Sequence, residues 1–282
     1  RIQEHTRNTP DLQEIGETHQ GTPVFVNHQY MDSTVKIAIG ETRLDSYQGF
    51  KGAFNAVFPG LASIQGIEAN RKLYFEGKSG PSIVELNPIK EDIVQIVNYI
   101  GVDMSINLTL NYDNQLTGAY VGGFLDSWGR SINGLSDSYE LENVEPSDIV
   151  IVSAGGFQCD YDLYNAAWGI ENASKIIKRN GTIILLAECS EGIGADALTS
   201  LARIEEQSEF QRRYKLGADV LQMIKRVLRN NSIILVSALP RYLVTQIGFD
   251  AARTANEAYS RAIGTRRSRK TTIFPYGCTS IF

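Results

Sequence analysis

Beyond residue 146 the chain alternates between short apolar runs and helix-like segments, and this alternation constrains the fold more than any other feature. Apolar runs at Asp148–Ser153, Thr182–Ala187 and Ser232–Ser237 have the length of buried strands. Helical patterns over Leu163–Lys178 and Phe249–Ile263 lie between or after them. Strands that alternate with helices favour a parallel sheet covered on both faces.

The rest of this half fits the same pattern. Gly194–Asn230 is predicted to hold one or two helices, Thr271–Phe274 a strand, and Ser280–Phe282 the end of the chain. A boundary is predicted near Glu145-Pro146-Ser147, where the pattern changes. We therefore expect an α/β protein of two domains, residues 1–145 and 146–282, with parallel or mixed sheets flanked by helices.

The first half mixes shorter elements. The run Thr34–Ile39, stopped by Gly40, predicts a buried strand. Gln48–Gly60 predicts a loop with one helical turn, and Leu61–Leu73 a helix. Pro88–Gly101 predicts an amphipathic helix, and Ser105–Gly118 a β-hairpin.

A further helix is predicted over Gly122–Tyr139, and its Trp128 is expected in the core, as is Trp168.

Composition excludes several classes of protein. The net charge of −5 disfavours a general nucleic-acid binder. No apolar run approaches the ~20 residues of a membrane span, so no membrane partner is expected. Three widely spaced cysteines argue against a disulfide framework or a zinc site and favour a cytoplasmic protein.

Two phosphate-binding motifs can be weighed. Gly192-Ile193-Gly194-Ala195-Asp196-Ala197 matches the Gly-x-Gly-x-x-Ala of a dinucleotide site, between a strand and a helix. The next predicted strand ends at Ala238-Leu239-Pro240 and offers no acidic residue that could bind a ribose hydroxyl. A tight strand-to-helix turn is therefore the favoured interpretation, and an NAD-type oxidoreductase stays an alternative. Gly77-Lys78-Ser79 lacks the first glycine of a P-loop.

The basic cluster Arg266–Lys270 is interpreted as a solvated loop at a helix C-terminus.

A glycine pair follows the first strand of the second half. Ser153-Ala154-Gly155-Gly156-Phe157 comes where ligands gather in open α/β sheets, at the carboxyl end of a strand. Asp160 and Asp162 add carboxylates. A structural turn and a ligand site are equally compatible with this loop.

Five segments, in order from about Asp11 to the end, resemble the nickel-dependent lactate racemase family. They are DLQEIGETHQGTPVFVN, TVKIAIGETRLDSYQGFKGAFNAVFPGLASIQGIEANR, SAGGFQCDYDLYNAAWG, AECSEGIGADAL and TTIFPYGCTSIF. The resemblance implies two α/β domains with the active site between them. The front part of the family's N-terminal domain has no match in this sequence, so the chain is expected to be a divergent member of the family or a fragment that lacks this part. The resemblance also explains the Gly-x-Gly-x-x-Ala without a dinucleotide.

The family's backbone-shaping positions are kept here. They are Gly49, Phe50, Gly52, Pro59, Gly60, Asn70, Gly155, Gly156, Asp160, Tyr164 and Gly169.

Its chemical positions are not kept. In the family a lysine is joined to a nickel-pincer nucleotide, and the matching position is Asn55. A nickel-binding histidine matches Arg71, which is permanently cationic and no metal ligand. An acid/base histidine matches Asp45, and a glutamine and a lysine of the second domain match Asn165 and Trp168. No residue is assigned to a metal, and the cofactor stays open.

Three functions follow. The first is a racemase or epimerase of a small hydroxy acid or sugar acid with altered chemistry, in which Asp45 is a base, Arg71 clamps the substrate carboxylate and Lys51 is a displaced lysine. The second is a non-catalytic ligand-binding member of the family, and the third is the oxidoreductase.

The resemblance places further ligand contacts in the same cleft, and a homo-oligomer is left open. The predicted cofactor-binding residues are Asn55, Gly155, Gly156, Tyr164, Asn165 and Trp168.

Overall fold

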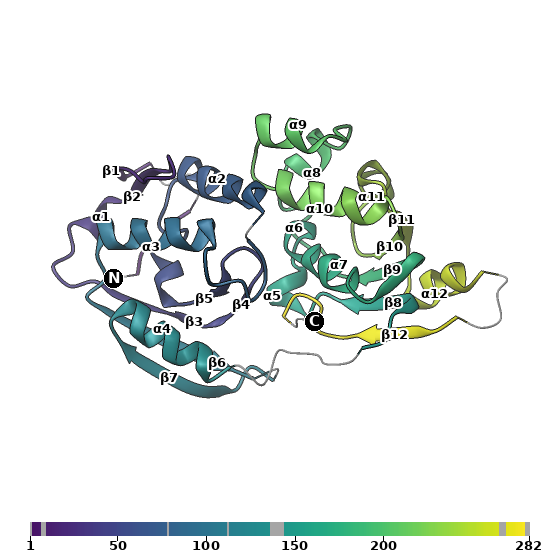
Figure 1. Cartoon of the computed structure of the whole chain (residues 1–282), viewed down its shortest axis with the longest axis horizontal. Helices are drawn as coiled ribbons and strands as arrows, with labels where there is room; N and C mark the ends of the chain where they lie inside the picture. The colour runs from purple at the N-terminus through teal and green to yellow at the C-terminus, as the bar shows by residue number, and fades with distance from the viewer. Residues whose placement is uncertain are drawn as a thin grey trace. The chain divides into compact units, whose positions relative to one another are not determined.

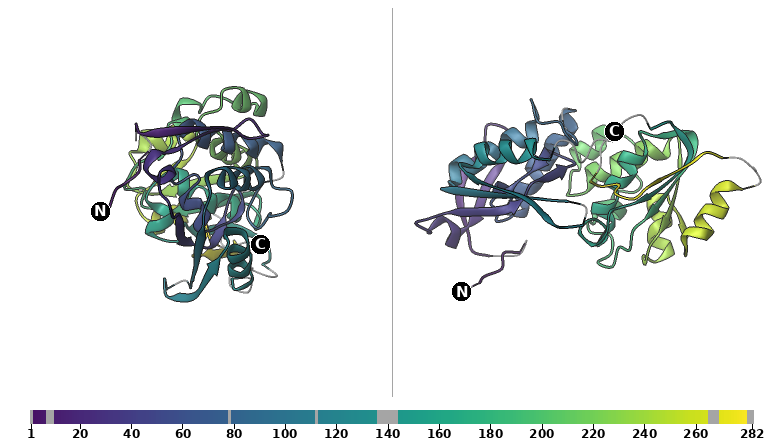
Figure 2. Two further views of the ribbon diagram at one scale, coloured as in Figure 1. Left: turned by 90° about the vertical axis from the view of Figure 1, so that its left-hand side faces the viewer. Right: turned by 90° about the horizontal axis from the view of Figure 1, so that it is seen from below.

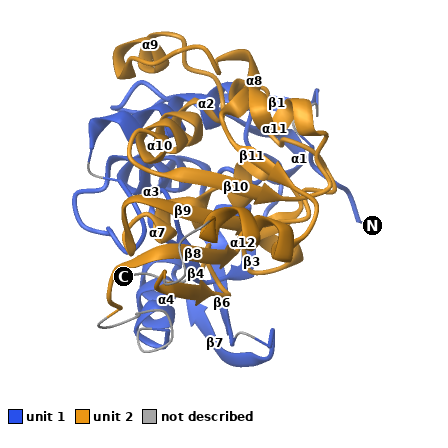
Figure 3. Ribbon diagram, turned by 90° about the vertical axis from the view of Figure 1, so that its right-hand side faces the viewer, with its two compact units in different colours: residues 1–140 blue, residues 141–282 orange. Residues whose placement is uncertain are grey.

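The computed structural model describes residues 2–6, 10–77, 79–111, 113–135, 144–264 and 269–279. The chain divides into two compact units, residues 1–140 and 141–282 (Figure 3). Both are α/β, as predicted. Lys78, residues 266–268 of the basic cluster and the final segment Ser280–Phe282 lie outside the described residues.

Unit 2 is built on a five-stranded parallel sheet (Figure 1). The strand order is β11-β10-β9-β8-β12, and every neighbouring pair is parallel. The strands are β8 (Ser147–Ser153), β9 (Ile177–Leu186), β10 (Ser232–Val236), β11 (Asp250–Ala252) and β12 (Thr271–Phe274). The predicted parallel sheet is confirmed.

Helices pack on this sheet because its strands are apolar on both faces. Ile149 and Ile184 lie in a buried cluster with Ala258 and Ala262 of α12, while α7 and α10 contact β8, β9 and β10. The helices of the unit are α5 (Phe157–Asp160), α6 (Leu163–Ala166), α7 (Trp168–Ala173), α8 (Ala197–Ser200), α9 (Gln207–Arg212), α10 (Ala218–Leu228), α11 (Arg241–Ile247) and α12 (Ala255–Ile263). Trp168 is buried, as predicted.

Two predicted helices of unit 2 are wrong in extent. The segment Leu163–Lys178 holds two short helices, and β9 already begins at Ile177. The segment Phe249–Ile263 begins with β11, and its helix starts only after Thr254, whose side chain accepts a hydrogen bond from the Glu257 N–H at 3.1 Å. Such an N-cap fixes where a helix begins.

Three helices, α8 to α10, occupy the segment Gly194–Asn230, for which one or two helices are predicted.

Unit 1 contains one mixed sheet and two small antiparallel pairs. Its strands are β1 (Leu12–Glu17), β2 (Pro23–Asn27), β3 (Ile37–Glu41), β4 (Arg43–Asp45), β5 (Gly49–Lys51), β6 (Met104–Leu110) and β7 (Leu116–Gly122). Its helices are α1 (His28–Met31), α2 (Ile64–Lys72), α3 (Pro88–Ile100) and α4 (Phe124–Asn133), with 3₁₀ turns η1 (Ala53–Ala56) and η2 (Leu73–Glu76). Strands β3, β6 and β7 run side by side in that order (Figure 2).

Local sequence explains the predicted elements that unit 1 confirms. Helix α3 begins at Pro88, and the Asn87 side chain accepts the Lys90 N–H at 3.1 Å. Its apolar face is buried, as the spacing predicts. The predicted hairpin is the antiparallel pair β6–β7.

The three-stranded sheet buries polar side chains on one side. Ser105, Asn107 and Thr109 of β6 are 0%, 0% and 1% exposed, and α4 and η1 contact this part of the sheet. The prediction of a buried strand over Thr34–Ile39 is wrong, because β3 starts at Ile37 and only its Ala38 is buried, with Ile39 exposed.

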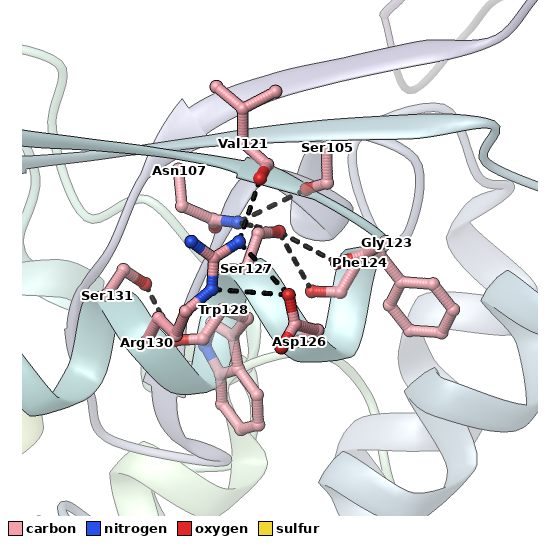
Figure 4. A network of polar contacts seen from close by, with 10 residues as sticks. All are labelled: Ser105, Asn107, Val121, Gly123, Phe124, Asp126, Ser127, Trp128, Arg130 and Ser131. Carbon is pink, nitrogen blue, oxygen red and sulfur yellow. Dashed lines mark hydrogen bonds and ion pairs between the residues drawn. The ribbon is translucent and has the colours of Figure 1, made fainter.

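Asn107 is the centre of the buried polar side (Figure 4). Its Oδ1 accepts hydrogen bonds from the Ala53 N–H at 2.8 Å and from the Thr42 hydroxyl at 3.2 Å. Its Nδ2 donates to Ser127 Oγ at 2.9 Å and to Ser105 Oγ at 3.2 Å. This one amide therefore ties β6 to α4 and to the start of η1.

No helix in the described ranges is both long enough and apolar enough to cross a membrane.

Candidate functional site

The segment from β4 to η1 carries three of the predicted site residues of unit 1, Asp45, Lys51 and Asn55. Asp45 Oδ1 accepts the backbone N–H groups of Tyr47 at 2.9 Å and Gln48 at 3.0 Å. An aspartate that bonds the chain two and three residues on stabilises a tight turn. Asp45 thus shapes the turn that joins β4 to β5.

Asn55 is fully engaged inside this loop. Its Oδ1 accepts from Gln48 Nε2 and from the Gly52 N–H, both at 2.8 Å. Its Nδ2 donates to Phe58 O at 3.2 Å and to Gln48 Oε1 at 3.3 Å. A primary amide offers two donor hydrogens and one acceptor oxygen, so both ends of this side chain hold the loop closed.

Arg71 lies in the last turn of α2 and is only 8% exposed. Its guanidinium carbon is 4.1 Å from the centre of the Tyr47 ring, which is a cation–π contact. The preceding Asn70 donates to Asp92 Oδ2 at 2.8 Å, which ties α2 to α3. The helix is therefore held so that Arg71 packs on the turn shaped by Asp45.

The structure brings Asp45, Asn55 and Arg71 together around the turn at Tyr47-Gln48. Lys51 lies further along, on β5, opposite Arg43 of β4. Its carbonyl accepts the Trp128 indole N–H at 3.3 Å. Trp128 itself is buried, as predicted.

These residues do not fit the nickel-pincer nucleotide that the family resemblance implies. An asparagine has no amine to join to the cofactor, and the amide of Asn55 is already bonded within the loop. The buried guanidinium of Arg71 offers no lone pair to a metal. Within the described part of the chain, no group of three or more His, Cys, Asp or Glu side chains could hold a metal ion.

The glycine pair of unit 2 lies where the strand order of the sheet reverses. Successive strands β8 to β11 proceed in one direction, and β12 returns to the other side of β8. In open α/β sheets such a switch point forms a crevice outside the carboxyl ends of the strands. Gly155 and Gly156 follow β8 there, with φ values of 114° and 91° that favour glycine.

The turn after β12 completes this edge. Gly277 N–H donates to Ser153 O at 2.8 Å, and Cys278 N–H donates to Ala154 O at 3.2 Å. No atom lies within 4 Å of the position that a Cβ on Gly156 would take. We name the two loops, residues 153–157 and 275–279, the switch-point loops.

The other predicted residues of unit 2 support the loop that follows β9. Asn165 Nδ2 donates to Tyr161 Oη and to Asp162 Oδ1, both at 2.8 Å. The Tyr164 N–H donates to Ile193 O at 3.0 Å. Trp168 is 6% exposed, so it lies in the core rather than on an open surface.

The Gly-x-Gly-x-x-Ala segment forms a tight turn against Asp162. Gly194 has a φ of 81°, and a Cβ there would lie 2.4 Å from Asp162 Cγ. The helix that follows, α8, has only four residues. The glycine is thus explained by local packing, and NAD binding stays an untested alternative.

Cys189 should be chemically inert in the folded chain. Burial, followed by the nearby charges of Asp162, Asp160 and Glu188, raises the pKa of the Cys189 thiol from 9.0 to about 12. This shift lowers the thiolate fraction at pH 8 about a thousandfold. We expect iodoacetamide to modify Cys189 at that pH only after unfolding, as peptide mass spectrometry can measure. Rapid modification of Cys189 in the native protein would contradict this.

Three features of the site have no signal in the sequence. Tyr47 and Gln48 hold Arg71 and Asn55, and although both lie in a matched segment, the resemblance assigns neither a role. The turn after β12 joins the glycine pair only because β12 pairs with β8.

Comparison with known proteins gives a consistent picture. Residues 142–282 match the lactate racemase C-terminal domain, and residues 1–81 match the lactate racemase N-terminal domain. The chain is 28% identical over 278 residues to a lactate racemase of Lactiplantibacillus plantarum, covering 93% of this chain and 65% of that protein. It is 24% identical over 248 residues to a lactate racemase of Thermoanaerobacterium thermosaccharolyticum, covering 84% and 58%.

Solved structures show the same fold. The lactate racemase apoprotein of Thermoanaerobacterium thermosaccharolyticum matches with a TM-score of 0.84 at 22% identity, over 98% of this chain and 70% of that chain. A protein of Thermotoga maritima matches with a TM-score of 0.73 at 14% identity, over 99% and 77%. The chain thus spans less than two thirds of the length of each of these curated relatives.

Proposed function

The chain belongs to the lactate racemase family, and from this premise we propose that it binds a small hydroxy acid or sugar acid without a covalently attached nickel-pincer nucleotide. The class of ligand rests on the relatives, which are named lactate racemases. The absence of the covalent cofactor rests on this chain's own residues.

Asn55 carries the proposal. The family resemblance matches this position to the lysine that holds the cofactor, and here the side chain closes its own loop with four hydrogen bonds. Arg71, at the position of a nickel ligand, packs on Tyr47 instead. At positions 55 and 71, residues that stabilise the loop therefore stand where the family resemblance implies residues that hold the cofactor and the nickel.

The switch-point loops of unit 2 are the proposed place of ligand contact. Gly156 leaves its backbone open to a close approach, Gly155 lies against Tyr276 of the turn after β12, and the family pattern keeps both glycines. In open parallel sheets, ligands bind outside the carboxyl ends of the strands at such a switch point. Tyr164 and Asn165 support the neighbouring loop rather than reach out from it.

An isomerase with altered chemistry is the second candidate, and one observation favours it. Both turn bonds to Asp45 end on the same oxygen, Oδ1, and the residue is partly exposed. A carboxylate can exchange a proton with substrate while it also stabilises a turn. In this case Asp45 would be the base, and Lys51 the nearest lysine on the paired strand.

One set of measurements separates the candidates. The protein, with any residues that precede Arg1, is analysed for nickel by elemental analysis and for covalent adducts by intact-mass spectrometry. Calorimetry measures the binding of D-lactate, L-lactate and gluconate, and chiral chromatography measures the interconversion of the two lactates. We expect no nickel, no adduct, saturable binding of one acid and no turnover. Turnover that Asp45→Asn abolishes would favour the isomerase, and nickel with an adduct of nucleotide mass would refute the proposal.

Restoring the lysine should damage the loop rather than rebuild the site. Asn55→Lys removes the bonds to Gln48, Gly52 and Phe58, and we expect it to lower the free energy of unfolding by about 2–3 kcal/mol, since one bond is worth about 1 kcal/mol. Gln13→Lys, on an exposed position of β1, is the control and should be neutral. Thermal unfolding measures both, and an unchanged midpoint for Asn55→Lys would contradict the closed loop.

A further inference from the structure

A buried asparagine of α7 holds the second of the switch-point loops. Asn172 is 1% exposed, and its Nδ2 donates a hydrogen bond to the Gly277 carbonyl at 2.7 Å. The two residues are far apart in the sequence and meet because β12 returns to pair with β8. Helix α7 contacts β8 and β9 (Figure 1), and through Asn172 it also holds the turn after β12.

The turn after β12 has little freedom at Gly277. A Cβ on this residue would lie 2.3 Å from Val152 Cγ2, 2.9 Å from Ser153 O and 3.2 Å from Gly169 Cα. The Gly277 N–H donates to Ser153 O at 2.8 Å, while its carbonyl accepts from Asn172. Both polar groups of Gly277 are therefore bonded, one to the other switch-point loop and one to α7.

An amide is an unusual side chain for this place in a helix. Among the residues that the structure describes, Asn172 Oδ1 has no hydrogen-bond partner, so the bond to Gly277 is the polar contact that this side chain makes. Its neighbours Ile170 and Ala173 are apolar and 0% exposed. A buried amide costs free energy wherever one of its ends lacks a hydrogen bond. What Asn172 contributes in return is the position of the turn.

The turn matters because it forms one side of the proposed ligand site. Tyr276 Cα lies 3.9 Å from the position that a Cβ on Gly155 would take. Tyr276 is 36% exposed and directly precedes Gly277. A displacement of the Gly277 carbonyl would therefore move Tyr276 relative to the open backbone at Gly156. Groups that bind a ligand must be held to within about 0.5 Å by the residues behind them.

We infer that Asn172 is a positioning residue of the switch-point loops. It holds Gly277, and through Gly277 it sets the place of Tyr276 beside Gly156. The inference rests on the proposed function, in which these loops contact the ligand. Because Asn172 is buried, it acts through the turn and not by contact with the ligand. Its removal should weaken ligand binding more than the loss of stability accounts for.

Two variants of α7 separate the position of the turn from stability. Asn172→Leu removes the donor to Gly277 but keeps a side chain of similar size. Ile170→Ala, the control, creates a cavity under the same helix and leaves the bond to Gly277 in place. If Asn172→Leu does not fold, Asn172→Ala takes its place.

Three measurements are made on the protein with any residues that precede Arg1. Calorimetry measures the binding of D-lactate, L-lactate and gluconate, and thermal unfolding measures the stability of each variant. Hydrogen exchange, followed by peptide mass spectrometry, measures the backbone amides of residues 275–279.

For Asn172→Leu we expect an affinity for the bound acid about tenfold lower than in the unchanged protein. Exchange at residues 275–279 should be about tenfold faster. Ile170→Ala should stay within about threefold of the unchanged protein in both measurements, although it lowers the unfolding midpoint at least as much.

Two results would overturn the inference alone. One is an affinity of Asn172→Leu equal to that of the control, and the other is unchanged exchange at residues 275–279 in Asn172→Leu. If the unchanged protein binds none of the three acids, the proposed function itself fails, and the role of Asn172 in ligand binding fails with it.

Discussion

Asn107→Leu is expected to lower the free energy of unfolding of unit 1 by about 3–5 kcal/mol. The leucine would leave the buried Ala53 N–H without its acceptor, and it would remove the bonds to the Thr42 and Ser127 hydroxyls, which keep Ser131 Oγ and the Gly123 carbonyl as partners. An unsatisfied buried polar group costs about 1–3 kcal/mol, and each further hydrogen bond that is lost costs about 1 kcal/mol. Urea unfolding in a Trp168→Phe background measures the loss, because the fluorescence then reports Trp128, which packs on Phe54 beside this network.

A leucine at an exposed position of the same unit provides the control. Gln29→Leu, on α1, should change the unfolding free energy by less than about 0.5 kcal/mol. A loss below about 1 kcal/mol for Asn107→Leu would mean that the network stabilises little, and that η1 is held by apolar packing instead.

Gly194→Val should destabilise unit 2 by a similar amount, about 3–5 kcal/mol. A valine at a φ of 81° carries backbone strain of about 1–3 kcal/mol. Its Cβ would also lie 2.4 Å from the carboxylate carbon of Asp162, which holds Asn165 through two bonds. Overpacking of this kind costs about 1–3 kcal/mol more.

Gly192→Val separates strain from packing. Gly192 has a φ of 89° but no atom within 4 Å of an added Cβ, so it should lose only the strain. Equal losses at the two positions would contradict the packing argument. Titration with NAD completes the comparison, because saturable binding lost in a folded Gly194→Val protein would favour the dinucleotide site of the oxidoreductase alternative.

The sequence allowed the parallel sheet of unit 2 to be predicted because its strands are continuous apolar runs, which period and length identify. Helix α3 was predictable from its apolar spacing and its Asn87-Pro88 start. Strand β11 and helix α11 were not, because three and seven residues of mixed character give too weak a pattern.

The sides of the β3-β6-β7 sheet could not be assigned from the sequence. Alternation along β6 is clear, but a period of two does not say which side faces the core. The usual rule would turn Asn107 outward, and the structure buries it.

The sequence predicted which site residues differ from the family pattern better than it predicted what those side chains contact. Residue matching alone predicted that Asn55 and Arg71 cannot carry the cofactor chemistry. What these side chains do instead depends on Gln48 and Tyr47, whose roles follow from the folded loop. Whether the predicted site residues contact a ligand stays a prediction.

The return of β12 to the side of β8 also has a consequence for synthesis of the chain. Thr271 of β12 pairs with Ile149 of β8, so β8 can complete its pairing on this side only after β12 has been synthesised. Loop closure over so long a separation is slow, and a ribosome making roughly 5–20 residues per second exposes the edge of β8 for several seconds. The nascent protein can therefore bring its two switch-point loops together only after β12 has left the exit tunnel.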